Sequence, residues 1–175
     1  MKPPDSHATT ADTLAGAFAR HHAPLLRYAA RLTGDAHRAQ DIVQDTFVKL
    51  MAQPPGAVDG HLAEWLFTVC RHRAVDVLRK EGRMKSLDTL PAAALPVAAE
   101  PAPAVTLERA ETHAALLRLL GGLPPNQQEV VRLKFQNGFS YEEISRITAL
   151  SVSNVGFLLH TALRRLRADF TALRP

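Results

Sequence analysis

Two short amphipathic stretches near the C-terminus, joined by a tight turn, constrain the fold of this chain more than any other feature. They span residues 139–170, FSYEEISRITALSVSNVGFLLHTALRRLRADF. Ser140 and Glu143 have the spacing of a capping box, in which each side chain accepts a hydrogen bond from the other residue's backbone and so starts a helix. The first helix then has an apolar face, formed by Ile144, Ile147 and Leu150.

The second stretch begins at Ser151, which can cap a longer helix. Its apolar residues recur every three or four positions, as on one face of a helix: Val152, Val155, Leu159, Leu163 and Leu166. Arg164, Arg165 and Arg167 follow near its end. A supporting helix, a tight turn and a longer helix with a cationic end can present side chains to a DNA major groove. The alternative reading of this stretch is an ordinary helical hairpin that packs a core.

The N-terminal half also shows helical patterns. We expect helices from Leu14 to Leu32, over 35–52 and from His61 to Lys80, with a break at Pro54-Pro55-Gly56. The expected apolar faces are Leu14, Phe18, Leu25, Tyr28, Ala29 and Leu32; Ile42, Val43, Phe47, Leu50 and Met51; and Leu62, Leu66, Val69, Ala74 and Leu78. No run alternates strictly as a half-buried strand does, so the sequence predicts an all-α fold with two small helical domains.

Composition divides the chain into four parts. Residues 1–13 are expected to be a disordered N-terminal tail, and 14–85 form the first helical domain. Residues 86–110 are rich in alanine and proline, which predicts an extended linker. Residues 111–170 form the second domain, in which helices from about Glu108 to Leu120 and over 126–137 precede the helix-turn-helix.

The overall composition favours an intracellular regulator. The formal net charge is +4, which is compatible with nucleic acid as a partner. Cys70 is the only cysteine, so an internal disulfide is impossible. A signal peptide and a membrane-spanning run are both missing from the pattern, so we expect a cytoplasmic protein without membrane insertion.

Catalytic and metal-binding patterns are weak. His61 with Glu64 and His72 with Asp76 have helical spacings, but two isolated pairs do not make a metal site. The chain has no glycine-rich phosphate loop and no nucleophile motif. We therefore expect no enzymatic activity, no cofactor and no metal.

Four segments, in order, resemble bacterial RNA polymerase sigma factors of the extracytoplasmic-function (ECF) class. Residues 35–50 are similar to the polymerase-gripping helix called region 2.2. Residues 64–83 resemble regions 2.3 and 2.4, which open the promoter and read its −10 element. Residues 123–145 and 151–167 resemble the start of region 4 and its −35-reading helix. The resemblance implies three partners: core RNA polymerase, promoter DNA and an anti-sigma factor.

The resemblance assigns the polymerase contact to one flank of the 35–52 helix. The residues on this flank are Asp41, Gln44, Asp45 and Lys49. Taken alone, they are typical of a solvated helix face.

Promoter opening needs cations for the backbone and surfaces that hold unstacked bases. By resemblance, the −10 contacts are Arg71, His72, Arg73, Arg79, Lys80 and Arg83, and the loop over 54–64 lines a pocket for a base. Trp65 can stack on a base, but its spacing from Leu62 and Val69 favours a place in the core. ECF sigma factors usually have asparagine at the position of His72, so the preferred base can differ.

The −35 contacts implied by the resemblance are Ser153, Asn154, Phe157, Thr161, Arg164 and Arg165. The usual pattern has basic or small polar residues where this helix has Gly156, Phe157, Leu158 and Thr161, so the family's −35 preference does not transfer. Two other functions stay open at this point: a helix-turn-helix regulator that binds operators alone, and a polymerase- or anti-sigma-binding protein that selects no promoter.

Overall fold

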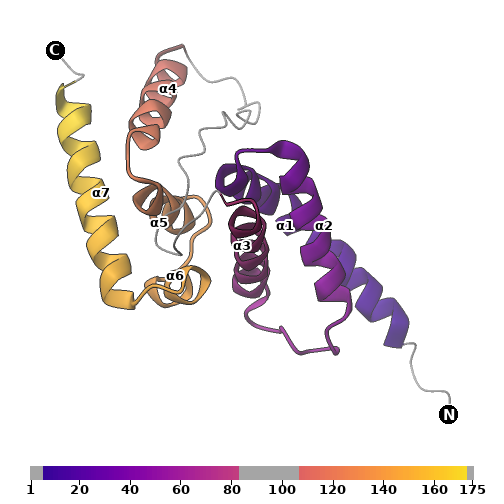
Figure 1. Cartoon of the computed structure of the whole chain (residues 1–175). Helices are drawn as coiled ribbons and strands as arrows, with labels where there is room; N and C mark the ends of the chain where they lie inside the picture. Colours follow the sequence, from indigo (N-terminus) through magenta and orange to yellow (C-terminus); the bar gives the residue numbers. More distant parts are fainter. Residues whose placement is uncertain (1–5, 83–106, 173–175) are drawn as a thin grey trace. The chain divides into compact units, whose positions relative to one another are not determined.

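The computed structural model describes the backbone of residues 6–82 and 107–172, and the side chains of 14–82 and 114–171. In these ranges the regular structure is entirely α-helical, which confirms the predicted fold class (Figure 1). The chain divides into two compact units, Met1–Arg83 and Met84–Pro175. The described helices include none that is long and apolar enough to cross a bilayer.

The first unit packs three helices around one core: α1 (Ser6–Thr33), α2 (Ala36–Met51) and α3 (Leu62–Lys80), with every pair in contact. Its most deeply buried side chains include Leu25, Ile42, Val43, Leu66, Phe67 and Leu78. Burying a side chain of this size stabilises the fold by about 1.5–3 kcal/mol relative to leaving it in water. Tyr28 of α1 and Phe67 of α3 pack ring against ring, with centroids 5.1 Å apart.

Helix α1 begins at Ser6, eight residues before the start expected at Leu14, and its range includes Pro24. The predicted tail over 1–13 was too long because residues 6–13 lack the apolar residues by which a helix is recognised. They also lack proline and glycine, the residues that oppose helix propagation most strongly. Most of the predicted linker, residues 86–106, lies outside the described residues, and its last residues begin α4.

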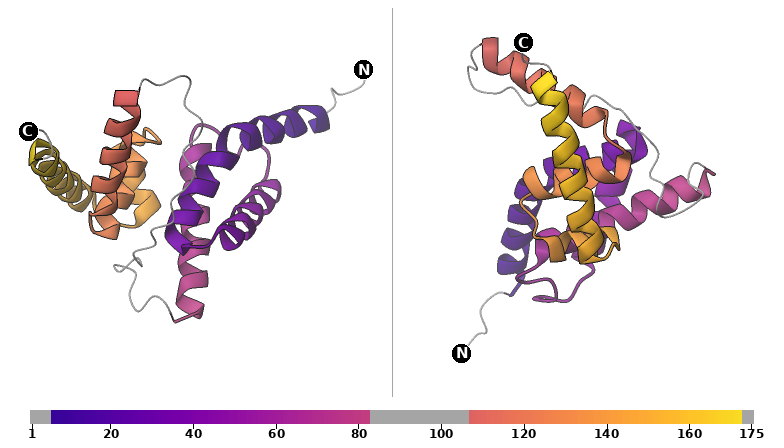
Figure 2. Two further views of the ribbon diagram at one scale, coloured as in Figure 1. Left: turned by 90° about the horizontal axis from the view of Figure 1, so that it is seen from above. Right: turned by 90° about the vertical axis from the view of Figure 1, so that its left-hand side faces the viewer.

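The second unit contains α4 (Leu107–Gly121), α5 (Pro125–Phe135), α6 (Tyr141–Thr148) and α7 (Val152–Ala172). The long α7 contacts the other three helices of this unit (Figure 2). Its core includes Val130, Leu133, Ile144, Ile147, Val155 and Leu159.

The predicted capping box is present at the start of α6. The Ser140 hydroxyl accepts the backbone N–H of Glu143 at 3.2 Å, and the Glu143 carboxylate accepts the N–H of Ser140 at 2.7 Å. Ala149 ends α6 in the left-handed conformation, with φ of 58°. The Ser151 hydroxyl then accepts the N–H of Asn154 at 3.2 Å, as expected for the cap of α7. These local bonds fix the turn between the two helices.

The apolar faces of three helices differ from those expected at their edges. Phe18, Met51, Val152 and Leu163 were expected to face the core, but each is at least 40% exposed. On α7 the buried row instead contains Leu158 and Ala162 beside Val155, Leu159 and Leu166. Sequence spacing locates the centre of an apolar stripe more accurately than its edges, because neighbouring elements cover those edges.

Candidate polymerase and nucleic-acid interfaces

An apolar groove runs between α1 and α2 on the first unit, with a volume of about 480 Å³. Phe18, Val48 and Met51 leave 48–67% of their surface exposed beside it. Its lining residues are Leu14, Phe18, His22, Leu26, Gln40, Gln44, Phe47, Val48 and Met51. An exposed apolar surface with polar residues at its edge is typical of a site for protein partners.

Aromatic rings form the floor of this groove. The Phe18 ring stacks on His22 with centroids 4.5 Å apart, and it lies 5.0 Å from the ring of Phe47. The sequence spacing predicts Phe18 on the core-facing side and assigns no role to His22. Leu14, Phe18, His22 and Leu26 follow one another at four-residue steps. This spacing indicates a row of side chains along one side of the helix that extends beyond the core.

The four residues predicted to contact polymerase lie on α2 but differ in their surroundings. Gln44 lines the groove, and Asp41 and Lys49 are exposed. Asp45 is half-buried, and its carboxylate accepts a hydrogen bond from Nε of Arg73 at 2.8 Å. One residue predicted to bind polymerase is therefore paired with one predicted to bind DNA.

Most of the predicted −10 cations lie on the outward side of α3. His72, Arg79 and Lys80 are exposed, and Arg73 is half-buried in its ion pair with Asp45. Arg79 has a weak partner in Asp76, with nitrogen and oxygen 3.9 Å apart. Arg83 lies outside the described residues.

Arg71 differs from the other predicted −10 cations because it is only 4% exposed. It follows Phe67 by four residues and precedes Ala74 and Leu78 by three and seven, so it lies on the buried face of α3. The expectation that Arg71 lies on the cationic surface is therefore wrong for this structure. Arginines that are close together in the sequence were all expected to face solvent, although Arg71 lies on the buried face of α3 and Arg79 on an exposed one.

Trp65 is half-buried and does not belong to the buried core of α3. Val69, His72 and Asp76 follow it at four, seven and eleven residues, so all four share the side opposite the core. The preference for a core tryptophan is therefore not supported. Trp65 and His72 lie two helical turns apart on this side of α3.

Most residues of the loop between α2 and α3 are exposed to solvent. Residues 54–57 and 59–61 are exposed, and Gly56 and Gly60 adopt φ of 82° and 80°. Backbone N–H groups of Ala57 and Asp59 donate to Pro54 and Gly56 at 3.1 and 3.2 Å. The loop is therefore shaped by its own turns, which leaves side chains such as His61 exposed to solvent.

The exposed side of α7 contains most of the predicted −35 residues. Ser153, Asn154, Arg164 and Arg165 are exposed, and Thr161 is half-buried. Phe157 is 66% exposed, which excludes it from the core. Arg165 approaches Asp169 to 3.8 Å, whereas Arg164 makes no ion pair with another described residue.

Sequence reasoning missed His160. It is exposed and lies three residues after Phe157 and four before Arg164, so all three form one row along α7. Its spacing of three and four residues from Phe157 and Arg164 is the sequence signal that places it on the same side of the helix. An imidazole can donate or accept a hydrogen bond at a base edge or a phosphate.

Gly156 lies in the interior of α7 beside the ring of Tyr141. A Cβ atom added at this glycine would lie 3.7 Å from the tyrosine ring, an ordinary van der Waals distance. Lys134 in turn lies over that ring, with its ammonium 5.4 Å from the centroid. Packing within the unit therefore does not require glycine at this position.

The remaining ionisable groups show no catalytic arrangement among the residues the structure describes. Burial raises the pKa of the Cys70 thiol to about 12, so this cysteine stays protonated and unreactive. In the same ranges, no three His, Cys, Asp or Glu side chains gather as metal ligands do.

Comparison with protein families supports both units. Residues 17–84 match the family model for sigma-70 region 2, and residues 113–166 match that for sigma-70 region 4. A solved structure of the sigma factor RpoE from Bartonella quintana, in complex with the anti-sigma factor NepR, has the same fold. Its TM-score is 0.65 at 23% sequence identity, over 95% of this chain and 99% of that one.

Curated relatives are similar over nearly the whole chain. The ECF RNA polymerase sigma factor SigL of Mycobacterium tuberculosis is 30% identical over 173 residues, which is 95% of this chain and 93% of SigL. SigE of Mycolicibacterium smegmatis is 31% identical over 155 residues, and the match spans 60% of its length. From the match to SigL over nearly the full length of both chains, together with the region 2 and region 4 matches, the chain belongs to the ECF RNA polymerase sigma factors.

Proposed function

We propose that this protein binds core RNA polymerase in the cytoplasm and directs it to particular promoters. The polymerase performs the chemistry, and this chain selects where it begins. The observation that carries the proposal is that a single chain combines an apolar groove on the first unit, exposed cations at the end of α3 and a row of exposed polar, aromatic and cationic residues on α7.

Polymerase docking is assigned to α2. Gln44 lines the groove, Asp41 and Lys49 are exposed on the same helix, and Val48 and Met51 supply apolar area. Aromatic and Met side chains enriched in a partly desolvated patch are the usual source of binding energy at protein interfaces. The charged residues at the edge set orientation and association rate more than affinity.

Strand opening is assigned to the outward side of α3. Arg79 and Lys80 bind the backbone, and His72 and Trp65 hold unstacked bases. Extruding a base costs a few kcal/mol, and stacking returns about 1–3 kcal/mol per base. A tryptophan and a histidine on one side of a helix provide the aromatic surfaces that such stacking needs.

The −35 element is assigned to α7. Its first exposed residues, Ser153, Asn154 and Phe157, face base edges, while Arg164 and Arg165 rest on the phosphate backbone. Asparagine can pair with adenine, and the phenyl ring can contact a thymine methyl group. This helix has few cations in its first turns, so apolar and polar contacts make up a large share of the readout.

The regulator implied by the family is an anti-sigma protein. The sigma factor RpoE of the solved complex binds one, NepR. We propose a regulator of the same kind for this chain.

The test is to add the purified protein to core polymerase and map transcription starts on genomic DNA. Specific starts that depend on the protein are expected. Polymerase binding without new starts would indicate an interaction protein, and tight binding to duplex DNA without polymerase would indicate a stand-alone regulator.

A further inference from the structure

A carboxylate lies at the cationic end of α3, where it opposes the proposed role of this helix. Glu81 directly follows Arg79 and Lys80 and is the C-cap residue. The C-terminal end of a helix has partial negative charge, so an acidic side chain is disfavoured there. An unpaired carboxylate would also repel the DNA backbone next to the two cations.

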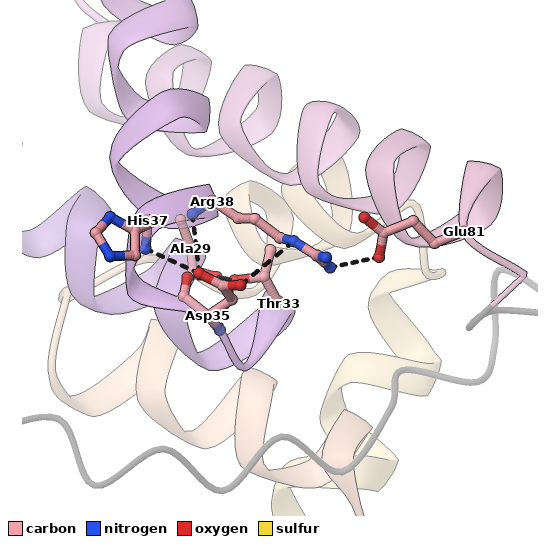
Figure 3. A network of polar contacts seen from close by, with 6 residues as sticks. All are labelled: Ala29, Thr33, Asp35, His37, Arg38 and Glu81. Atoms are coloured by element: carbon pink, nitrogen blue, oxygen red, sulfur yellow. Dashed lines mark hydrogen bonds and ion pairs between the residues drawn. The ribbon is translucent and has the colours of Figure 1, made fainter.

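Arg38 pairs with this carboxylate from another helix. Its Nη1 donates to Oε2 of Glu81, so the start of α2 is joined to the end of α3 (Figure 3). The same guanidinium places Nε 3.4 Å from the carboxylate of Asp35. The two side chains of the Arg38–Glu81 pair are 34% and 32% exposed, so the pair remains in contact with solvent.

Asp35 is itself committed to capping α2. Its Oδ1 accepts the backbone N–H of His37 at 2.9 Å and of Arg38 at 3.1 Å. These contacts, the hydrogen bond from Arg38 first, lower the pKa of the Asp35 carboxyl, so it remains ionised. Arg38 therefore extends past a fixed negative charge toward Glu81.

The end of α1 holds this arrangement in place. The buried Thr33 hydroxyl donates to the carbonyl of Ala29 at 2.9 Å and accepts the N–H of Asp35 at 3.3 Å. Gly34, with φ of 70°, makes the intervening turn. Thr33, Asp35, Arg38 and Glu81 thus form one polar chain that joins all three helices of the first unit.

We propose that Arg38 is a positioning residue for DNA binding, which neutralises Glu81 so that the end of α3 meets DNA as a net cation. Arg38 does not touch DNA in this account. The inference rests on the proposed function, because it assigns α3 to promoter DNA.

The expected effect is that of one unit of charge near a nucleic-acid backbone. For single strands, each neutralised phosphate contributes about 0.7 to the slope of log affinity against log salt. Across a fourfold change in salt concentration, this slope corresponds to roughly a threefold change in affinity. Partly exposed ion pairs contribute little to stability, so the substitutions should leave the fold intact.

The experiment compares four variants of the full chain: Arg38→Gln, Glu81→Gln, the double variant and Arg20→Gln. Arg20 is the matched control because it is an exposed arginine thirteen residues before Thr33, roughly 20 Å away along α1. Binding to a fluorescein-labelled oligothymidylate of about 20 nucleotides is measured by anisotropy at two salt concentrations. Thermal unfolding of each variant checks the fold.

Arg38→Gln should weaken binding and lower the salt slope by up to about 0.7, so its loss of affinity should be up to roughly threefold larger at the lower of two salt concentrations that differ fourfold. Glu81→Gln should tighten binding and change the slope in the opposite direction. The double variant should bind like the unsubstituted protein, and Arg20→Gln should have less effect than Arg38→Gln. Weaker binding by Glu81→Gln, without restoration in the double variant, overturns the inference because the pair would then be purely structural. An equal loss from Arg20→Gln overturns it as well. If the unsubstituted protein binds no oligonucleotide, the assignment of α3 to DNA fails, and this inference fails with it.

Discussion

The two helices proposed to meet DNA, α3 and α7, manage their charges differently. On α3, Arg73 pairs with Asp45 and Arg79 approaches Asp76, and Arg71 is buried. On α7, Arg164 has no described ion-pair partner, and Arg165 lies 3.8 Å from Asp169, a pair as weak as that of Arg79 with Asp76 at 3.9 Å. Arg71 and Arg73 of α3 are therefore buried or paired within the first unit, whereas Arg164 of α7 is available to phosphates. A cation's position in the sequence does not determine its availability.

The two helices also differ in what lies between their cations. On α3, the outward side contains Trp65, Val69 and His72, which suits unstacked bases. On α7, the exposed row contains Ser153, Phe157 and His160, which suits groove edges in duplex DNA. We expect α3 to respond most to changes in its apolar and imidazole groups, and α7 to respond to both polar and cationic substitutions.

The largest effect on stability is expected from a comparison of a buried and an exposed apolar residue of α7. Leu159→Ala should lower the free energy of unfolding by about 2–5 kcal/mol, because this side chain is 1% exposed. Phe157→Ala should change it by less than about 0.5 kcal/mol, and should instead weaken promoter binding. Urea unfolding of both variants measures the contrast, and comparable destabilisation by the two would place Phe157 in the core.

The next effect separates base contacts from backbone contacts within α7. Asn154→Ala should change which −35 sequences are used, at a discrimination cost of roughly 1–3 kcal/mol. Arg165→Ala should weaken all promoters similarly and flatten the salt dependence. A randomised −35 library transcribed with each variant at two salt concentrations provides the measurement. If Arg165→Ala reshapes the preference while Asn154→Ala leaves it untouched, the assigned roles are reversed.

Gly156→Ala sharpens the question of why α7 contains an interior glycine. Because the added Cβ would meet the Tyr141 ring only at 3.7 Å, the substitution should stabilise the protein by about 1 kcal/mol. Thermal unfolding measures this gain. If promoter binding falls while stability rises, the glycine serves close approach to DNA; a loss of stability would mean that Tyr141 cannot accommodate a methyl group.

The smallest effect tests the difference in charge balance directly. Arg164→Gln should lower the salt slope of promoter binding by about 0.9, the contribution of one phosphate contact in duplex DNA. Arg73→Gln should lower it by less, because Asp45 already holds this guanidinium at 2.8 Å. The two slopes are compared with polymerase-bound protein at one promoter. Equal slopes would show that Arg73 leaves Asp45 when DNA binds.

Much of the fold follows from local sequence signals. The capping box at Ser140 and Glu143, the Asp35 cap and the break at Pro54-Pro55-Gly56 each locate a helix boundary to within a few residues, because their chemistry is local. The start of α1 was placed late because its first residues have no apolar pattern. The partial exposure of Val152 and Leu163 depends on neighbouring helices, which spacing alone does not reveal.

The candidate sites could be predicted less completely. Exposed polar positions such as Asp41, His72 and Asn154 were identified by resemblance, and the structure leaves them accessible. The pairing of Asp45 with Arg73 joins residues 28 positions apart on two different helices, and the burial of Arg71 depends on the exact face of α3 on which it lies. The aromatic groove was missed because its residues come from both α1 and α2.

The measurement that tests the central claim most directly is a combined footprint on a promoter found by start-site mapping. With polymerase and this protein together, we predict hydroxyl-radical protection near −35 and permanganate-reactive thymines near −10. His72→Ala should reduce the permanganate signal more than it reduces core binding. Protection near −35 by this protein alone, at equal strength without polymerase and with no melted thymines, would contradict the account.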